Sequence, residues 1–545
     1  MKLDANVLLR MVCVCVISEA IPVQAATGVW SNVSGGYWAE ASNWQNDVVP
    51  SSAGSSPGEG DVADFSLLAA GETVTVTNHT ASGALWFSGL AGDFWTISGG
   101  SLGLANAPDF LVERYGEIRV DGGELNLVSP VTGGNDGIVK TGTGTLRLSS
   151  TNTFTGTTHV KAGRLVLTQG AALAVSTLIF DSPDAALELE GDAQIGGIES
   201  RSVPLPTVDL GGHTLSVGGE NWAVRVFDGH FSNGTLCLAR GDKLVLTDTQ
   251  NVAAVRLENG SLACGGSIKV AGWWRFDDAG QIGKDSGPHA NHLVTNGTQA
   301  QWLVNDPERG SVLTLGGSGT WLVGPNGGNV VGLPVSNMSF TVAFWLKPDA
   351  GVQNQAGIYA WGVESQSRRY NMIRLNTPTS NTPLMHTNWG NNHEIPYAPG
   401  LMDGAWHHVV IVYREGYYSY YIDGELVFNF VESEELKVAA GNFTLGKGFS
   451  ADPFKGLIDD FLITQGALSY GQVKALWQNG TLPDEKSPAN LLPETADVEI
   501  AYNGTLSLAG DQALNTLGGS GAAGHVVLQD GAVLTVTGGG GWTAR

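Results

Sequence analysis

Apolar and polar residues alternate in short segments that repeat along much of the chain. Each segment begins at a glycine, continues with a polar residue and ends in Leu-x-Leu, so that every second side chain is apolar. The first leucine recurs after 23, 21 and 19 residues, and weaker copies follow at Leu215, Leu236 and Leu262. The clearest copies begin at Gly100, Gly123, Gly144 and Gly163.

This spacing predicts the fold of the repeat region. Two-residue alternation is typical of strands, and a period near 20 residues indicates a stack of similar β-coils. Each coil exposes an apolar face that only its neighbours can bury. We therefore predict an all-β protein built on a right-handed β-solenoid (β-helix). A β-sandwich with regular hairpins is the alternative that the pattern leaves open.

The pattern changes between Trp273 and Gly480, where strands lengthen and aromatic residues gather. This part predicts an inserted antiparallel β-sandwich, a jelly roll, at residues 268–482, because facing sheets would bury its alternating apolar residues. A single helix is expected at its end, with Ser469 as the cap. Solenoid rungs are expected at residues 27–267 and again at 490–545. The rungs stop abruptly, so we expect either a piece of a longer protein or a cap that is not recognisable.

Composition narrows the range of functions. Charged residues make up only 15% of the chain, and 28 Lys and Arg face 52 Asp and Glu, a formal net charge of −24. So acidic a surface repels phosphate backbones, which excludes nucleic acid as the expected partner. The acidity favours solubility, and a smaller part of it could serve divalent cations.

The first 25 residues are typical of a secretory signal peptide. Lys2 and Arg10 flank the amino end of an apolar run, and Val23-Gln24-Ala25 fits the small-residue cleavage rule. The run is too short to span a bilayer, so we expect no transmembrane segment after cleavage. These features predict a secreted or surface-exposed protein.

Two cysteines, Cys237 and Cys264, remain after that cleavage. Export favours a disulfide between them. Their places in the repeat argue against it, because one lies a single residue after its leucine and the other lies two residues after. Strand side chains alternate between faces, so the two sulfurs would point in opposite directions unless a bulge intervenes.

Part of the repeat region also resembles a known family. Three segments follow one another: G-T-G-T-L-R-L at Gly142–Leu148, N-T-F-T-G at Asn152–Gly156 and K-A-G-R-L at Lys161–Leu165. Together they resemble the autotransporter-associated β-strand repeat, with the best match at residues 133–167. The resemblance implies a β-helical passenger region of a bacterial surface protein.

The insert shows a second resemblance. It resembles the laminin-G-like, concanavalin A-like lectin/glucanase jelly roll, which agrees with the sandwich that its pattern predicts. The motifs are W-W-R-F-D at Trp273–Asp277, D-S-G at Asp285–Gly287, F-T-V-A-F-W-L-K-P at Phe340–Pro348, W-H-H at Trp406–His408 and G-L-I-D-D-F at Gly456–Phe461.

The carboxylates of this insert bear on whether it catalyses a reaction or binds a metal ion. A catalytic glucanase of this fold needs an acid and a nucleophile on one strand, usually as Glu-x-Asp-x-x-Glu. That array is missing, so we predict no enzyme activity. The resemblance implies a structural Ca²⁺ held by Asp285 and Asp460, with Asp459 as the rival ligand. The alternative is that Asp285 only caps a turn and the Asp459–Asp460 pair forms a solvated edge.

A sugar-binding face is the second expectation for the insert. Trp361 and Trp389 could stack on a sugar ring, and Asn391 and His393 could donate hydrogen bonds beside them. Core packing is the alternative for the tryptophans. The function that we expect is a solenoid stalk that displays a laminin-G-like domain for binding a glycan or glycoprotein, as in adhesion. A polysaccharide-active enzyme, of the β-helix lyase or glycosidase type, and a purely structural surface protein are the alternatives.

Overall fold

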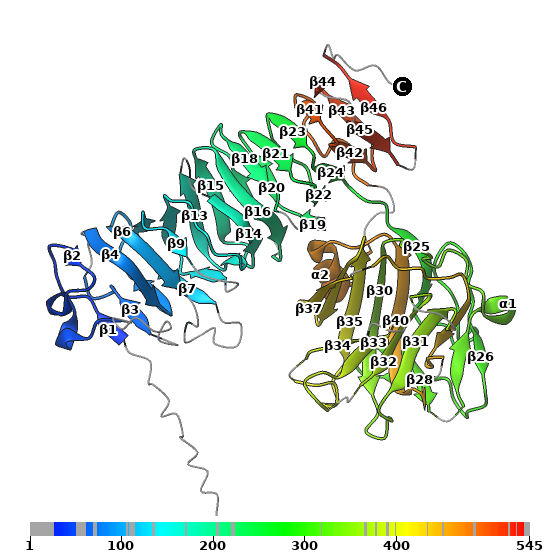
Figure 1. Ribbon diagram of the computed structural model, residues 1–545. Coiled ribbons are helices and arrows are strands. Elements are labelled where there is room, and N and C mark those ends of the chain that lie inside the picture. Colours follow the sequence, from blue (N-terminus) through cyan, green and yellow to red (C-terminus); the bar gives the residue numbers. More distant parts are fainter. Residues whose placement is uncertain are drawn as a thin grey trace, which may run out of the picture.

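The computed structural model shows a rod of stacked strands with a separate β-sandwich at its side (Figure 1). The predicted signal peptide lies outside the described residues. No helix in the described ranges has both the length and the apolar character needed to cross a membrane. The ranges described are 27–50, 61–68, 73–104, 107, 115–132, 137–168, 170, 172–202, 206–219, 224–317, 319–364, 368–376, 379–387, 392–397, 399–432, 434–449, 452–482, 487–520, 524–529 and 531–538.

One face of the rod is a parallel sheet of 13 described strands. Its order follows the chain, as expected when each rung adds one strand beside the previous rung. The strands are β1 (Thr27–Val29), β3 (Val62–Asp64), β5 (Ala84–Phe87), β7 (Gly116–Val120), β10 (Ile138–Thr141), β12 (Thr158–Val160), β14 (Ala172–Phe180), β16 (Ala193–Ser200), β18 (Thr214–Val217), β21 (Thr235–Ala239), β23 (Ala254–Glu258), β41 (Asp497–Ala501) and β44 (Thr516–Ser520).

Two further parallel sheets and a strand pair complete the rod. The first holds β2 (Gly36–Tyr37), β4 (Thr73–Ser82), β6 (Phe94–Leu104), β8 (Glu124–Leu127), β11 (Thr145–Leu148), β13 (Gly163–Thr168), β15 (Ala185–Glu190), β17 (Thr207–Asp209) and β20 (His230–Ser232), with β9 (Val131–Thr132) beside β6. The second holds β19 (Val224–Phe227), β22 (Lys243–Leu246), β24 (Ser261–Cys264), β42 (Thr505–Leu508) and β45 (His525–Leu528). The pair is β43 (Gln512–Leu514) with β46 (Leu534–Val536).

The repeated leucines form ladders inside the rod. Leu125, Leu146 and Leu165 pair in register on successive rungs, and all three are fully buried. The copy at Gly100 differs, because Leu125 pairs there with Trp95, while Leu102 pairs with Val131 of β9. Strand β6 runs past the corner of its rung, so its own Leu-x-Leu belongs to the next side of the coil.

The sandwich interrupts the rod without breaking it. Strand β23 pairs in register with β41, and β24 pairs with β42, so the rungs before and after the insert stack directly. The buried leucines of both parts belong to one continuous core. The predicted all-β solenoid with an inserted sandwich is therefore confirmed.

The sandwich consists of two antiparallel sheets packed face to face, apart from one short parallel pair, β31 with β39. One sheet holds β27 (Leu303–Asp306), β28 (Gly310–Gly316), β40 (Lys455–Gln465), β30 (Phe340–Pro348), β35 (His407–Arg414), β36 (Tyr417–Ile422) and β37 (Glu425–Val431), with β25 (Lys269–Trp274) beside β40. The other holds β26 (Val294–Asn296), β29 (Trp321–Val323), β38 (Asn442–Leu445), β31 (Ala356–Gly362), β32 (Tyr370–Leu375), β33 (Leu384–Thr387) and β34 (Asn392–Ile395), with β39 (Asp452–Pro453) beside β31.

Helix α2 (Tyr470–Asn479) covers the outer side of the first sheet. Ser469 caps it as predicted. The Ser469 hydroxyl oxygen accepts a hydrogen bond from Gln472 N–H, and the Gln472 side-chain oxygen accepts one from Ser469 N–H. Val473 and Leu476 of the helix pack on Val410 and Leu462 of the sheet in a second apolar cluster. The helix therefore lies on the side of the sandwich that faces the rod (Figure 1).

Aromatic residues close the amino-terminal end of the rod. Trp30, Trp38 and Trp44 are buried there with Phe65, and the Trp30 and Trp44 rings meet at 5.0 Å between centroids. Two 3-10 helices lie beside them, η1 (Ala41–Asn43) and η2 (Gln45–Asp47), and the remaining helix, α1 (Pro325–Gly328), lies in the sandwich. These rings shield the apolar interior of the first rung from water.

Both cysteines are free and buried. Cys264 points into the rod core, whereas Cys237 lies between two inward-facing leucines of β21 and so faces the other way. The alternation of side chains thus keeps the two thiols apart, as the sequence register predicts.

Candidate functional site

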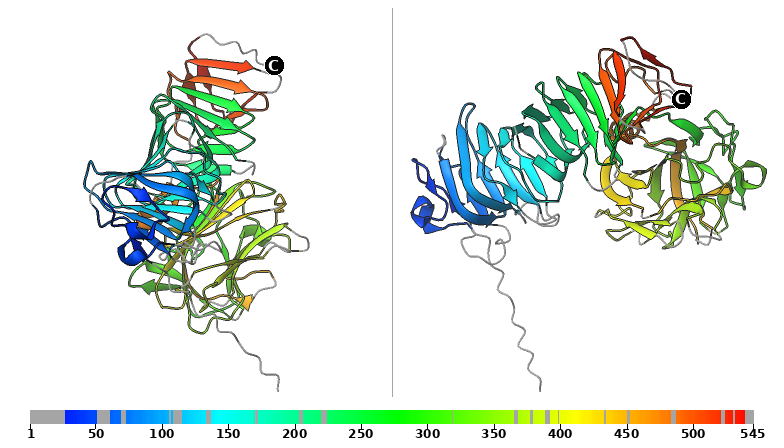
Figure 2. Two further views of the ribbon diagram at one scale, coloured as in Figure 1. Left: turned by 60° about the vertical axis from the view of Figure 1, so that its left-hand side comes forward. Right: turned by 45° about the horizontal axis from the view of Figure 1, so that its top comes forward.

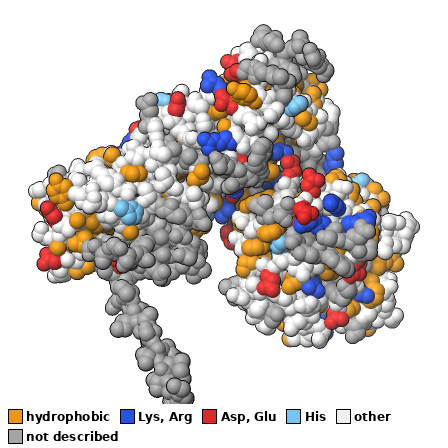
Figure 3. Space-filling model, viewed as in Figure 1, with side chains coloured by type: hydrophobic (Ala, Val, Ile, Leu, Met, Phe, Trp, Pro, Cys, Tyr) orange, Lys and Arg blue, Asp and Glu red, His pale blue; other side chains and the backbone are white. Residues whose placement is uncertain are grey.

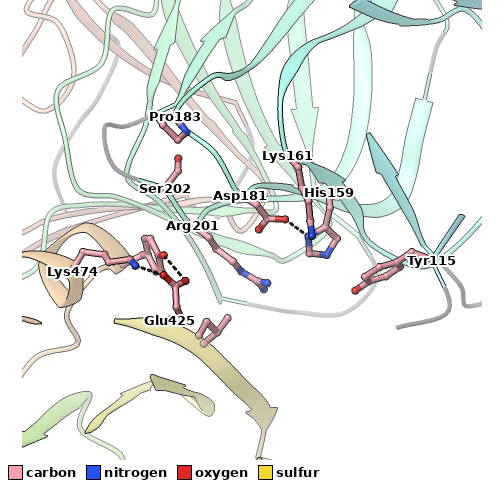
Figure 4. Close-up of a pocket in the computed structure, with 11 residues that line it drawn as sticks. Tyr115, His159, Lys161, Asp181, Pro183, Arg201, Ser202, Glu425 and Lys474 are labelled. Atoms are coloured by element: carbon pink, nitrogen blue, oxygen red, sulfur yellow. Dashed lines mark hydrogen bonds and ion pairs between the residues drawn. The ribbon is translucent and has the colours of Figure 1, made fainter. Parts of the chain in front are cut away.

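A cavity of about 710 Å³ lies where the sandwich meets the side of the rod. We call it the junction cleft. Figure 2 shows the sandwich beside the rod from two directions, and Figure 3 shows Lys and Arg side chains in the crevice between them. The residues that line the cleft are Tyr115, His159, Lys161, Asp181, Pro183, Arg201, Ser202, Glu425, Leu426, Tyr470 and Lys474 (Figure 4).

The rod wall of the cleft is a charged ladder on successive rungs. Lys161, Asp181 and Arg201 each follow the last residue of a strand, at intervals of 20 residues. Those last residues pair in register from β12 to β14 and from β14 to β16. Parallel stacking therefore places the three charged side chains one above another at the same corner of the coil.

A hydrogen-bonded histidine lies beside this ladder. His159 Nδ1 is 2.6 Å from an Asp181 carboxylate oxygen, and its Nε2 is 3.1 Å from the Thr157 hydroxyl. The Thr157 hydroxyl donates in turn to the Tyr115 hydroxyl at 3.3 Å, and the Tyr115 and His159 rings lie 5.0 Å apart. The network fixes the histidine ring and places an aromatic surface at this end of the cleft.

Arg201 projects from the ladder into the cleft, between the His159–Asp181 pair and Glu425 (Figure 4). Its Nη2 donates to Glu199 at 3.2 Å, and Glu199 also accepts a bond from Arg225 at 2.5 Å. Burial alone would raise the pKa of Glu199, but Arg225 and Arg201 outweigh burial and hold that pKa below its usual value. One ionised carboxylate thus serves two guanidinium groups.

The sandwich wall comes from β37 and helix α2. Lys474 pairs with Glu425, and the Tyr470 hydroxyl donates to the same carboxylate at 3.3 Å. The Lys474 ammonium also lies 5.6 Å from the centre of the Tyr470 ring. Burial, followed by the charge of Glu425, raises the pKa of Tyr470, which keeps its hydroxyl protonated as a donor.

A buried polar contact holds the two walls together. Asp228, which follows β19 of the rod, accepts a bond from Gly471 N–H in the first turn of α2 at 3.0 Å. It also accepts from the Thr247 hydroxyl at 2.7 Å. Arg414 of the sandwich is buried nearby with the charge of Asp228 acting on it, and it donates to the Ala467 carbonyl at 2.8 Å. A carboxylate at the start of a helix also matches the helix dipole.

The junction cleft was missed by sequence reasoning because it exists only once the two modules are placed together. One signal could have found half of it, namely the 20-residue spacing of Lys161, Asp181 and Arg201 in a region with a 20-residue period. Without the strand register that spacing gives no reason to favour these residues over other charged ones.

Two of the four predicted sugar-binding residues, Trp361 and His393, lie in the described part of the chain. Trp361 has no exposed area: it packs in the sandwich core against Phe340 and Tyr359 and donates to the Pro334 carbonyl at 3.1 Å. It is therefore core packing, which corrects its prediction as a stacking platform.

Of the other three predicted ligand residues, His393 lies in the described ranges, on β34. His393 is 9% exposed, with its ring 3.9 Å from Phe430 and its Nε2 3.3 Å from Glu432. Trp389 and Asn391 lie outside the described residues. Sugar binding at this end of the sandwich stays a prediction.

The carboxylates predicted to hold calcium have protein donors instead. Asp285 accepts bonds from the backbone N–H groups of Trp273, Gly287 and Asn291 at 2.7–2.9 Å, so it caps a turn. Asp459 and Asp460 both pair with Arg309, each at 2.7 Å. These partners leave the three carboxylates poorly suited to a shared metal site.

Their positions in the sheet separate them further. Trp274 of β25 bridges to Asp285 on one side and pairs with Phe461 of β40 on the other. The strand thus lies between Asp285 and the Asp459–Asp460 pair. Across the described ranges, no group of three or more His, Cys, Asp and Glu side chains is placed to hold a metal ion. Calcium binding stays a prediction from the family resemblance.

Comparison with known proteins finds a family match within each module. Residues 316–474 match the family described as concanavalin A-like lectin/glucanases superfamily, and residues 138–167 match the passenger-associated-transport-repeat. The chain is 30% identical over 233 residues to the adhesin BmaC autotransporter of Brucella suis biovar 1 (strain 1330). That alignment covers 43% of this chain but only 6% of the adhesin.

Solved structures resemble only part of the chain. Domain 4 of AbnA, a GH43 extracellular arabinanase from Geobacillus stearothermophilus, in complex with arabinotriose, is 23% identical. The match covers 39% of this chain and 100% of that one, with a TM-score of 0.30. The binding domain of Paraclostridial Mosquitocidal Protein 1 is 15% identical, over 39% of this chain and 52% of that one, with a TM-score of 0.31. Both family matches agree with the resemblances predicted from the sequence: the chain joins a passenger-associated-transport-repeat to a domain of the concanavalin A-like lectin/glucanases superfamily.

Proposed function

We propose that this chain is a bacterial surface or secreted adhesion protein that binds a glycan in the junction cleft. The rod displays the concanavalin A-like domain, and the two modules together form the binding site. The observation that carries the proposal is the composition of the cleft: an aromatic ring at one end and charged, hydrogen-bonded side chains from both modules.

The chemistry of the cleft suits a sugar. Tyr115 offers an aromatic face, with the His159 ring 5.0 Å away and tilted by 42°, and amphipathic aromatics of this kind stack on sugar rings. Asp181, Glu425 and Lys474 offer acceptors and donors for hydroxyl groups. These side chains are already held by internal hydrogen bonds, so little conformational entropy is lost when a ligand binds.

The hydrogen-bond partners of Asp181 and Glu425 favour binding over catalysis. Asp181 is hydrogen-bonded to His159, and Glu425 pairs with Lys474 and Tyr470. A glycosidase needs one carboxyl group to keep a proton for the leaving oxygen. Hydrogen-bond donors and cations contact both carboxylates here, which suits acceptors for sugar hydroxyls rather than a proton donor.

Two similarities support a surface role. The repeat at residues 138–167 is a passenger-associated-transport-repeat, and the curated relative is an adhesin autotransporter. The alignment covers a small share of that adhesin, so its partners are not transferred to this chain.

A glycan array probed with the intact chain from residue 27 tests the proposal. We expect binding to a defined set of glycans, and Tyr115→Ala should weaken it roughly two- to tenfold because one stacking contact is removed. Tyr37→Ala is the matched control, since Tyr37 is exposed at the far end of the rod. Equal losses from both variants, or no glycan bound by the folded chain, would contradict the proposal.

A further inference from the structure

The junction cleft carries a positive charge on an acidic protein. Of its charged side chains, Lys161, Arg201 and Lys474 are cationic, whereas Asp181 and Glu425 are anionic. Counted over Lys, Arg, Asp and Glu, the cleft lining is net positive, although the chain as a whole has a formal charge of −24. A local reversal of sign inside a cavity attracts ligands of the opposite charge.

The charged side chains of the cleft have partners on the protein, and one carboxylate beside the cleft is shared between two cations. Asp181 is hydrogen-bonded to His159 and Glu425 to Lys474 and Tyr470, so both carboxylates have partners on the protein. Arg201 shares its carboxylate: Glu199 is divided between Arg201 and Arg225. Two guanidinium groups thus share one hydrogen-bonded carboxylate next to the cleft, while Asp181 acts on Arg201 from farther away.

Arg201 is placed so that its positive charge faces a ligand in the cleft. Glu199 anchors one guanidinium nitrogen, and the group projects into the cleft (Figure 4). A guanidinium has five donors in a planar fork that fits a carboxylate with two parallel hydrogen bonds. Because the anchor fixes the side chain beforehand, little rotamer entropy is lost when a carboxylate binds.

From this arrangement we infer that the junction cleft selects a sugar that carries a carboxylate, of the uronic acid type. The carboxylate pairs with Arg201, with the charge of Lys161 beside it, and the sugar ring lies toward Tyr115 and His159. This inference rests on the proposed function and names the class of its ligand.

The test compares two probes that differ only in charge. Calorimetric titration of the intact chain with an oligogalacturonate, and with the same oligomer fully methyl-esterified, measures what the carboxylates contribute. We expect the acid to bind roughly ten- to a hundredfold more tightly than the ester, the range for a charge-assisted hydrogen bond. Raising the salt concentration should weaken only the acid.

Two variants locate the effect. Arg201→Gln should reduce the affinity for the acid to that for the ester, and Lys161→Gln should weaken the acid roughly threefold through lost attraction alone. Lys161 is exposed, so Lys161→Gln should keep the protein folded. It therefore tests the inference even if Arg201→Gln does not fold. Arg164→Gln is the control, because Arg164 is exposed on a different sheet of the rod.

The outcomes separate this inference from the proposed function. Equal affinity for acid and ester, or a sulfated oligomer that binds while the acid does not, would overturn the inference. If Tyr115→Ala still weakened binding of a neutral glycan, the proposed function would stand without it. Failure of every glycan to bind would remove both.

Discussion

The most informative perturbation is removal of the Asp228 carboxylate at the contact between the modules. Asp228→Ala takes away the acceptor for Gly471 N–H and for the Thr247 hydroxyl. It also removes the opposite charge beside Arg414, which lies buried between the modules. No lining residue of the junction cleft is changed.

The magnitude follows from these contacts. A buried donor that loses its hydrogen-bond acceptor costs about 1–3 kcal/mol. Gly471 N–H and the Thr247 hydroxyl both lose their acceptor, so we expect a total loss of about 3 kcal/mol. That loss weakens docking of the sandwich on the rod roughly a hundredfold. Adding Arg414→Met should recover part of it, since the uncompensated charge is then removed.

Two solution measurements read out docking in the intact chain. Small-angle scattering should show a larger radius of gyration for Asp228→Ala, and hydrogen exchange should show faster exchange at the Gly471 amide. Asp184→Ala is the control, because Asp184 is an exposed carboxylate of the rod. A folded Asp228→Ala protein with unchanged scattering and exchange would refute the role given to this contact.

Three further predictions concern single sites. Lys140 is fully buried and donates to the carbonyls of Thr141, Gly142 and Ala162, so Lys140→Met should destabilise the rod by about 3 kcal/mol in urea unfolding; an unchanged midpoint would contradict this. Burial and, after it, the charge of Asp460 raise the pKa of Asp459 to about 7. Both outweigh Arg309, which lowers that pKa. The folded protein therefore binds this proton more tightly than the unfolded chain does. The free energy of unfolding falls as pH rises from about 4 through 7, by at most about 1.4 kcal/mol per pH unit. Asp459→Asn should flatten that slope in thermal melts, and an equal slope in both proteins would argue against it. Because Asp285 is satisfied by backbone donors, EDTA should leave the melting temperature unchanged; a fall of several degrees would instead support the calcium site implied by the family resemblance.

Local patterns were enough to predict most of the fold. The Leu-x-Leu spacing places Leu125, Leu146 and Leu165 in one ladder because a parallel stack must bury the same face on every rung. The capping of α2 by Ser469 was likewise readable, since it depends on residues within one turn. The insertion was visible because its strands lengthen where its aromatic residues gather.

The candidate site depended on information that a local pattern does not contain. Trp361 lies on β31, where every residue is buried, so alternation gave no sign of which face it occupies. Asp285 and Asp460 are close in the family pattern but lie on opposite sides of β25. Arg201 and Lys474 line one cleft because the sandwich docks on the rod, through contacts that include Asp228 and the Lys243–Glu415 ion pair. Long-range placement, rather than residue type, decides each of these cases.

A crystal structure of the intact chain with its strongest array ligand tests the central claim most directly. The account predicts the sugar in the junction cleft, in contact with His159 and Arg201 of the rod and Lys474 of the sandwich. A sugar bound instead at the β33–β34 end of the sandwich, away from the rod, would contradict the claim that both modules build the site.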